Sequence, residues 1–195
     1  MSQENVEVVR KPLRVREQSR RTLDQRLALR FPRLAAMQAR LIGRLSPRSR
    51  LRQAAIWRGT RLAAEAFNRA DLDAYLLAFH PDCEWHPLPE FVEAGFAEPS
   101  YRGLAGFRVY WTAVSDVWGS ELNFQPVELI DAGDRLVALA SLHARAQTSG
   151  VTLTRKYAQV VTLKDGLVIR QQEYPSHSEA LEAVGLSEQD AHAES

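Results

Sequence analysis

The sequence predicts an α+β fold, in which helices in the first part of the chain are followed by an antiparallel sheet. Residues 13–68 repeat apolar side chains at three- and four-residue steps, which is the period of a helix. After Gly119 the chain forms four extended runs separated by the turn sequences DAGD, TSG and KDG, so neighbouring strands are expected to pair as hairpins. Helices followed by a run of antiparallel strands are typical of α+β proteins with helices on one face of the sheet.

Three helices are expected in the first part of the chain. They span residues 13–30, 33–45 and 48–68. Pro32 and Pro47 interrupt the helical pattern and favour helix starts, with Ser46 as the expected N-cap before Pro47. Most of this part, residues 1–53, is assigned to a helical extension that precedes the main domain.

The middle of the chain alternates short elements with one longer helix. A short helix capped by Asp71 is expected to end at Pro81, and the strand CEWHPLP that follows is halted by its prolines. A loop over 88–102 leads to a helix over 103–119, whose aromatic residues share one broad face. This spacing of aromatic residues indicates a helix that packs on the core.

The last part of the chain is expected to form the sheet. The expected strands span 121–131, 135–147, 151–163 and 167–174, and a short helix follows over 176–186. We therefore assign residues 54–186 to one main domain and residues 187–195 to a polar tail.

The composition narrows the class of protein. Cys83 is the single cysteine, which excludes an internal disulfide framework and suits a reducing compartment, so we expect a cytoplasmic protein. No apolar run is long enough to span a membrane as a helix. The sequence has no GxGxxG motif, P-loop or nucleophile elbow, and no spacing of three metal ligands. We therefore expect neither a metal nor another cofactor.

The net charge of +1 conceals a strong asymmetry. Residues 1–61 hold 16 basic and 4 acidic side chains, so 16 − 4 gives +12. Residues 62–195 hold 9 basic and 20 acidic side chains, so 9 − 20 gives −11. For the basic segment, residues 10–61, three partners are considered: an anionic membrane, nucleic acid, or an acidic protein surface on this chain or another.

The last hairpin allows two registers. With a three-residue loop Lys164-Asp165-Gly166, the face that is apolar near the turn becomes polar further away. The direct pairs are then Leu163 with Leu167, Val161 with Ile169, Gln159 with Gln171, and Tyr157 with Glu173. A two-residue turn Asp165-Gly166 would instead oppose Val161 with Arg170. The first register pairs like with like, and it predicts a pocket with a polar end; the alternative is a solvated sheet edge.

The preceding strand also has two registers. A four-residue loop sets small side chains opposite large ones, which would leave a cavity; the pairs are Ala138 with Gln159, Ala140 with Tyr157, and Leu142 with Arg155. A three-residue loop would turn Ser141 and His143 inward instead. A slip of one residue moves every side chain to the other face, so both possibilities stay open.

Several stretches resemble SnoaL-like proteins of the nuclear transport factor 2-like superfamily. The stretch AEAFNRADLDAYLLAFHPDCEWHPLPE resembles their opening, with a helix ending in Phe-Asn, a short acidic helix, and a strand with Trp-His. Further similarities are Tyr101-Arg102-Gly103 before the next helix, SGV at 149–151, and TLKDGLVIRQQEY followed by SEALEAVGL. The resemblance covers roughly residues 62–186 and leaves the Arg-rich extension outside.

The resemblance implies a cone-shaped fold, in which a curved sheet wraps around helices and encloses a ligand cavity, and it implies a homodimer. This fold hosts polyketide cyclases, isomerases, dehydratases, epoxide hydrolases and non-catalytic binders. By similarity to limonene epoxide hydrolase, Glu173 takes the position of a carboxylate that activates water. The other charged groups of that enzyme fall near Ala140 and Leu142, and a frequent family aspartate falls at Ser176, so the full catalytic set is absent.

Three residues are candidates for chemistry. Glu173 is a candidate acid or base, because a carboxyl group in an apolar cone has a raised pKa; alternatively it pairs with Arg155 or lies at the rim. His86 is a candidate proton shuttle or a structural residue, and Tyr157 is a candidate donor to a ligand oxygen or a packing residue. The expected ligand-binding residues are Trp85, Tyr110, Trp111, Val114, Leu142, Arg155, Gln159, Val161, Ile169 and Gln171.

These observations predict a protein that binds a small apolar, oxygenated molecule. One hypothesis is an acid/base enzyme of isomerase, cyclase, dehydratase or hydrolase type that uses Glu173 and Tyr157. The alternative is a non-catalytic ligand-binding or interaction module, which its basic helices tether to a membrane, nucleic acid or a partner.

Overall fold

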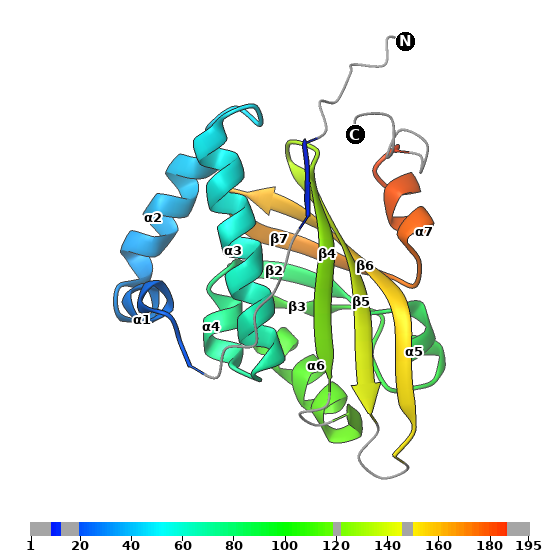
Figure 1. The fold of residues 1–195 in the computed structure, drawn as a ribbon. Helices are drawn as coiled ribbons and strands as arrows, with labels where there is room; N and C mark the ends of the chain where they lie inside the picture. Colours follow the sequence, from blue (N-terminus) through cyan, green and yellow to red (C-terminus); the bar gives the residue numbers. More distant parts are fainter. Residues whose placement is uncertain (1–8, 13–19, 119–121, 146–149, 187–195) are drawn as a thin grey trace.

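The computed structural model describes residues 9–12, 20–118, 122–145 and 150–186 of the 195-residue chain. Figure 1 shows a twisted, curved sheet that α3 (Arg50–Asn68) crosses, with α1 (Leu23–Arg30) and α2 (Pro32–Gly43) beyond α3. One helix, α7 (His177–Glu182), packs on the opposite face of the sheet. The predicted α+β class is therefore confirmed.

The first helices are shorter than expected. Thr22 and Gln25 form a capping box at the start of α1, and residues 13–19 of the expected first helix lie outside the described residues. The predicted N-cap of α3 was wrong. Ser46 lies before a turn that contains Pro47, and Ser49 caps the helix by accepting a hydrogen bond from the Arg52 N–H.

The middle of the chain holds α4 (Leu72–Leu76), β2 (Phe79–His86), α5 (Pro89–Glu93), β3 (Tyr101–Arg102) and α6 (Gly103–Trp118). Asp71 caps α4 as expected, but the helix ends before the strand begins at Phe79, so Pro81 lies inside β2. The expected loop contains α5 and β3, which are too short to leave a periodic pattern in the sequence.

Within the described residues, seven strands form one sheet in the order β1-β4-β5-β6-β7-β2-β3. The four long strands of the hairpin series were predicted. They are β4 (Asn123–Asp131), β5 (Arg135–Arg145), β6 (Thr152–Lys164) and β7 (Leu167–Tyr174). Each of these strands is antiparallel to the next, whereas β2 runs parallel to β7. The short strand β1 (Val9–Pro12), which was not expected, pairs with β4.

The last hairpin begins in the second of the two expected registers and then departs from it. Asp165 and Gly166 both adopt a positive φ and form a two-residue turn, so the three-residue loop was wrong. The register then shifts by one residue near Ile169, and Gln159 pairs with Glu173. The turn and the shift together displace the pairing by two residues from the preferred register. Because side chains alternate with a period of two, the expected residues still share the inner face.

The register between β5 and β6 is the one that sets small side chains opposite large ones. Ala138 pairs with Gln159, Ala140 with Tyr157, and Leu142 with Arg155. Ala138 and Ala140 are buried on the inner face, and His143 is exposed on the outer face. This arrangement leaves room between the sheet and α3.

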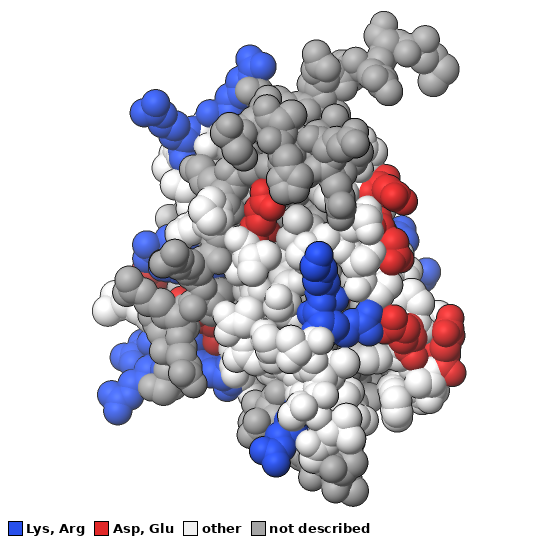
Figure 2. All heavy atoms as spheres, turned by 45° about the vertical axis from the view of Figure 1, so that its right-hand side comes forward, with Lys and Arg blue, Asp and Glu red and all other residues white. Residues whose placement is uncertain are grey.

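The charge asymmetry of the sequence appears as an uneven distribution of charge over the surface. In Figure 2, many basic side chains lie at the left-hand edge of the molecule, on the side of the first helices, and a smaller basic group lies near the middle of the face beside acidic side chains. Inside the molecule, Arg52 pairs with Asp131 at 3.3 Å, and both side chains are buried. Among the described helices, none combines the length and the hydropathy that a membrane crossing requires.

Candidate functional site

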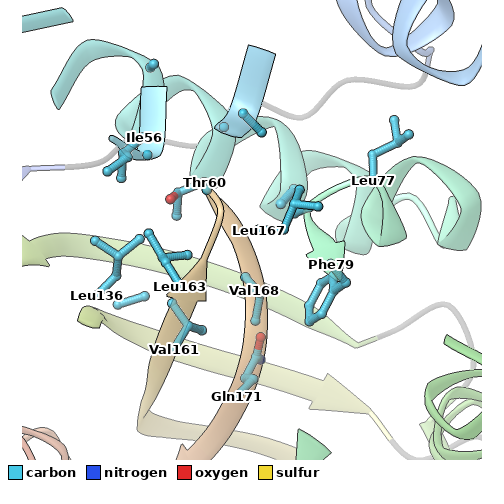
Figure 3. Close-up of a pocket in the computed structure, with 18 of the residues that line it drawn as sticks. Ile56, Thr60, Leu77, Phe79, Leu136, Val161, Leu163, Leu167, Val168 and Gln171 are labelled. Carbon is cyan, nitrogen blue, oxygen red and sulfur yellow. The ribbon is translucent and has the colours of Figure 1, made fainter. Parts of the chain in front are cut away.

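A cavity of about 320 Å³ lies between the helices and the inner face of the sheet (Figure 3). Residues of α2, α3, the segment 75–79 and the four long strands line it. Most of the lining is aliphatic or aromatic, as shown by Ile56, Leu136, Val161 and Phe79. Cavities near this size, lined by apolar side chains and a few polar groups, are typical of small-molecule sites.

One wall of the cavity comes from α2, where small residues allow close packing on the β6–β7 turn. The wall consists of Ala35, Gln38, Ala39, Ile42 and Gly43. A Cβ atom on Gly166 would lie 1.9 Å from the carbonyl oxygen of Ala39, and one on Gly43 would lie 2.7 Å from the Gly166 nitrogen. Glycine is therefore required where the two backbones meet.

The cavity has a polar end formed by two glutamines. Gln171 of β7 is only 2% exposed; its side chain interacts with the Tyr75 hydroxyl, but its Nε2 atom makes no hydrogen bond of full geometry among the described residues. Gln159 of β6 also lines the cavity, and its Nε2 donates to the Tyr157 hydroxyl at 2.8 Å. A buried amide whose donor group is incompletely satisfied can gain free energy by donating a hydrogen bond to a ligand oxygen.

Glu173 is buried behind this polar end and does not line the cavity. Its Oε2 accepts a hydrogen bond from the Leu88 N–H at 3.1 Å and one from the Tyr110 hydroxyl at 3.3 Å. Burial raises the pKa of this carboxyl group to about 7, although interactions with Tyr157, the Leu88 N–H and Tyr110 lower it. Glu173 is thus able to exchange a proton near neutral pH.

Tyr157 connects Glu173 with the cavity. Its hydroxyl interacts with the Glu173 carboxylate and accepts the hydrogen bond from Gln159. Burial raises the pKa of the phenols of Tyr157 and Tyr110 well above the usual value, so both remain hydrogen-bond donors at neutral pH. A chain of polar contacts therefore runs from Glu173 through Tyr157 and Gln159 to the cavity.

The predicted ligand-binding residues fall into separate places. Gln159, Val161 and Gln171 line the cavity. Four others belong to or pack on the aromatic cluster between α6, α4 and β2, namely Trp85, Tyr110, Trp111 and Val114. Leu142 is buried in a second cluster under α3. The space expected next to Trp85 and Tyr110 is filled by their own contacts with Phe107, whose ring centroid lies 4.3 Å from that of Trp85.

Three further predicted residues lie away from the cavity. Arg155 pairs with Glu90, so the expected alternative in which Arg155 pairs with Glu173 does not occur among the contacts of the structure. His86 lies with its Nε2 atom 3.3 Å from Glu84 Oε1 and does not line the cavity. Ile169 falls at the register shift in β7 and is partly buried.

The sequence reasoning missed the contribution of the helices to the cavity. Ala35, Ala39 and Gly43 recur at four-residue steps, which places small residues along one line of α2. This signal for close helix packing was present in the sequence, but it did not show what α2 packs on. Among the described residues, no cluster of three potential metal ligands occurs.

Comparisons with known proteins agree with this geometry. A family model described as a SnoaL-like domain matches residues 60–171, so that α1, α2 and half of α3 precede the match. A comparison with curated proteins gives no match.

Many solved structures share the fold. One of them is the structure of TerC co-crystallized with polyporic acid, whose sequence is 25% identical to this chain. The alignment covers 61% of this chain and 89% of the TerC chain, with a TM-score of 0.55. An NTF2-like protein of unknown function from Burkholderia pseudomallei is 24% identical over 66% of this chain and 95% of its own, with a TM-score of 0.55. A putative SnoaL-like polyketide cyclase from Jannaschia is 16% identical over 67% and 90%, with a TM-score of 0.54.

Proposed function

The chain belongs to the SnoaL-like family, and on this premise we propose that it binds a compact apolar molecule that carries an oxygen atom. The observation that carries the proposal is the buried side-chain amide of Gln171 at the end of an apolar cavity, where it interacts with the Tyr75 hydroxyl but its Nε2 makes no hydrogen bond of full geometry among the described residues. The apolar walls favour a ligand that is mostly uncharged, and the Gln171 amide favours a ligand with a hydrogen-bond acceptor such as a carbonyl oxygen.

The similarity to TerC supports a ligand of this class. TerC was co-crystallized with polyporic acid, an oxygenated compound. Part of the cavity wall, from α2 and the first half of α3, lies before the matched family domain, so the ligand need not be the same.

The proposal is tested with two probes of nearly equal shape, fluorenone and fluorene, which differ by a carbonyl group. We expect fluorenone to bind more tightly than fluorene, and we expect Gln171→Leu to weaken fluorenone binding about tenfold, the order of one hydrogen bond in an apolar site. Fluorene binding should change little in this variant. Isothermal titration calorimetry measures both affinities.

Gln172→Leu is the matched control, because Gln172 is the next residue of β7 and points to the other face of the sheet. A second variant, Ala138→Phe, fills the cavity from β5 and should abolish binding of both probes. If neither probe binds, or if both bind equally to Ala138→Phe and the unmodified protein, the proposal is wrong.

Acid/base catalysis is a second candidate function, and the raised pKa of Glu173 favours it. Tyr157 and Gln159 lie between Glu173 and the cavity. A reacting ligand would therefore exchange its proton with the Glu173 carboxyl through the Tyr157 hydroxyl, or it would reach the carboxyl after displacing a glutamine side chain. Compounds that bind would be incubated with the protein and with Glu173→Gln, and products followed by mass spectrometry. Conversion by the unmodified protein alone supports an enzyme; binding without conversion supports a binding module.

A further inference from the structure

The helices α1 and α2, with the residue between them, carry a series of large apolar side chains that are exposed. The outer apolar stripe consists of Leu23, Leu27, Phe31, Leu34, Met37 and Leu41, each between 50% and 71% exposed. On α2 these residues recur at three- and four-residue steps and therefore share one face. The cavity residues Ala35, Ala39 and Gly43 lie on another face of the same helix. The stripe is thus not part of the core or of the cavity.

Arginine side chains accompany this stripe. Four of them are exposed and have no ion-pair partner among the described residues: Arg26, Arg30, Arg33 and Arg44. The one acidic residue of the two helices, Asp24, already pairs with Arg58. The stripe therefore lies in a strongly positive environment.

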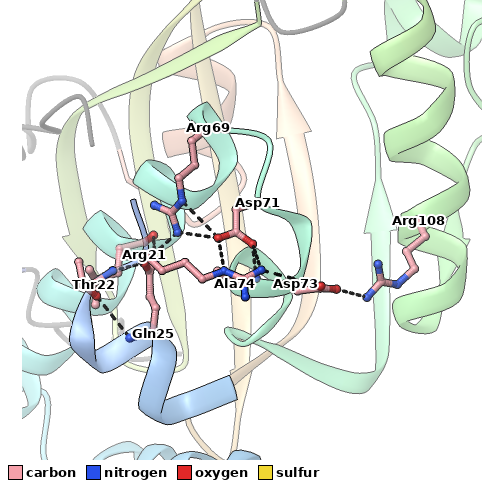
Figure 4. A network of polar contacts seen from close by, with 9 residues as sticks. Arg21, Thr22, Gln25, Arg69, Asp71, Asp73, Ala74 and Arg108 are labelled. Atoms are coloured by element: carbon pink, nitrogen blue, oxygen red, sulfur yellow. Dashed lines mark hydrogen bonds and ion pairs between the residues drawn. The ribbon is translucent and has the colours of Figure 1, made fainter. Parts of the chain in front are cut away.

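Polar contacts hold these helices on the body, so the stripe has a defined position. Figure 4 shows Arg21, just before α1, reaching Asp71, and both of its hydrogen bonds to this carboxylate are 2.7 Å long. Gln25 donates to the Leu62 carbonyl of α3 at 3.0 Å and accepts from Arg69 at 2.8 Å. The helices cannot bury the stripe by rotating on the body without breaking these contacts.

Large exposed apolar side chains together with unpaired arginines fit one kind of partner. An anionic lipid surface satisfies both, because its head groups attract arginine and its acyl boundary accepts leucine, methionine and phenylalanine. Nucleic acid would pair with the arginines but would leave the apolar side chains in water. A second copy packed by two-fold symmetry would bring arginines against arginines. We propose that α1 and α2 form a docking surface for anionic membrane lipids, on which the protein lies without crossing the bilayer.

The test measures sedimentation of the full chain with vesicles. One set contains phosphatidylcholine alone, and the other contains equal parts of phosphatidylcholine and phosphatidylserine. We expect binding to the second set, weakened by added salt. The stripe variant Leu34→Ser/Met37→Ser/Leu41→Ser and the charge variant Arg33→Glu/Arg44→Glu should each lose about tenfold or more in affinity for the mixed vesicles.

The matched controls are Val109→Ser, which removes an apolar side chain that is 62% exposed on α6, and Lys156→Glu on the outer face of β6. Both should bind vesicles as the unmodified protein does, and circular dichroism should show that every variant remains folded.

Three outcomes would overturn the proposal. The first is equal or absent binding to the two vesicle sets. The second is binding to a short DNA duplex, lost in the charge variant, without binding to vesicles. The third is a dimer that the stripe variant converts to a monomer, measured by analytical ultracentrifugation, while vesicle binding remains unchanged.

Discussion

Glu173 is an ionisable residue buried within the fold. Its carboxyl group is buried between the Leu88 N–H and the phenols of Tyr110 and Tyr157, and its pKa is raised to about 7. The usual pKa of an exposed glutamate is near 4.5. Between these two values the folded state binds a proton that the unfolded state has lost, so the free energy of unfolding falls as the pH rises.

The first prediction concerns this titration. Glu173→Gln removes the buried ionisable group, so it should flatten the decline in stability between about pH 5 and about pH 7. Above that range the variant should be more stable than the unmodified protein by up to about 3 kcal/mol, the value of the full pKa shift. Urea denaturation at a series of pH values measures this difference. Glu182→Gln, at an exposed position of α7, is the control. Parallel pH profiles for the unmodified protein and Glu173→Gln would contradict the prediction.

The sequence was sufficient to select the inner face of β6 and β7, but it could not identify which residues of that face line the cavity. Gln159 and Gln171 line the cavity, whereas Tyr157 and Glu173 lie behind it. The difference depends on the volume of Trp85 and Tyr110, which lie against Glu173 and pack on Phe107. Strand alternation defines a face, but only packing decides where along that face a space remains.

At the scale of elements, the contact between α2 and the β6–β7 turn controls the shape of the cavity. The backbones approach so closely at Gly43 and Gly166 that neither position has room for a methyl group. The Arg40–Asp165 pair, at 3.3 Å, lies at the same contact but is exposed and adds little. Backbone packing therefore positions this wall.

We predict that Gly166→Ala destabilises the protein more than its backbone conformation alone requires. Gly166 has a φ of +77°, and alanine in this region costs roughly 1 kcal/mol. The added Cβ would also meet the Ala39 carbonyl, so α2 must move away from the turn. Gly185→Ala is the control, because Gly185 has the same φ and no atom within 4 Å of an added Cβ. Thermal unfolding of both variants measures the difference. Equal losses of stability in the two variants would show that α2 can move away from the turn without a cost in the free energy of unfolding.

The elements themselves were largely predictable, and their contacts were not. Periodicity and turn sequences placed the three first helices and the four long strands, because each repeats a local pattern. The register shift at Ile169 leaves no such pattern, since a bulge is a response to the packing of neighbouring strands. The elements β3 and α5 were expected as loop because they are too short to show a periodic pattern in the sequence.

At the scale of the whole molecule, Arg52 joins three parts of the fold. Its guanidinium pairs with Asp131 at the end of β4 and donates to the carbonyl of Gly43 at 3.0 Å and to that of Gly133. It is 4% exposed, so the extension and the sheet share a buried ion pair. Removing one member of such a pair leaves the other charge buried without compensation.

Arg52→Met should therefore destabilise the protein by roughly 3–5 kcal/mol. Arg58→Met is the matched control, because the Arg58–Asp24 pair is exposed and should be worth less than about 1 kcal/mol. Denaturant titration of both variants compares the two free energies of unfolding. A loss in Arg52→Met no larger than in Arg58→Met would mean that water or other groups solvate Asp131 once the arginine is gone.

The wall that α2 contributes has a consequence for the evolution of the cavity. The residues of this wall precede the stretch that matches the family model. Mutations in residues 32–43 can therefore change the shape of the cavity without altering the sequence of that stretch. Part of the cavity wall is thereby encoded outside the shared stretch, whereas Gln159 and Gln171 lie within it, so both parts of the gene determine the shape of the cavity.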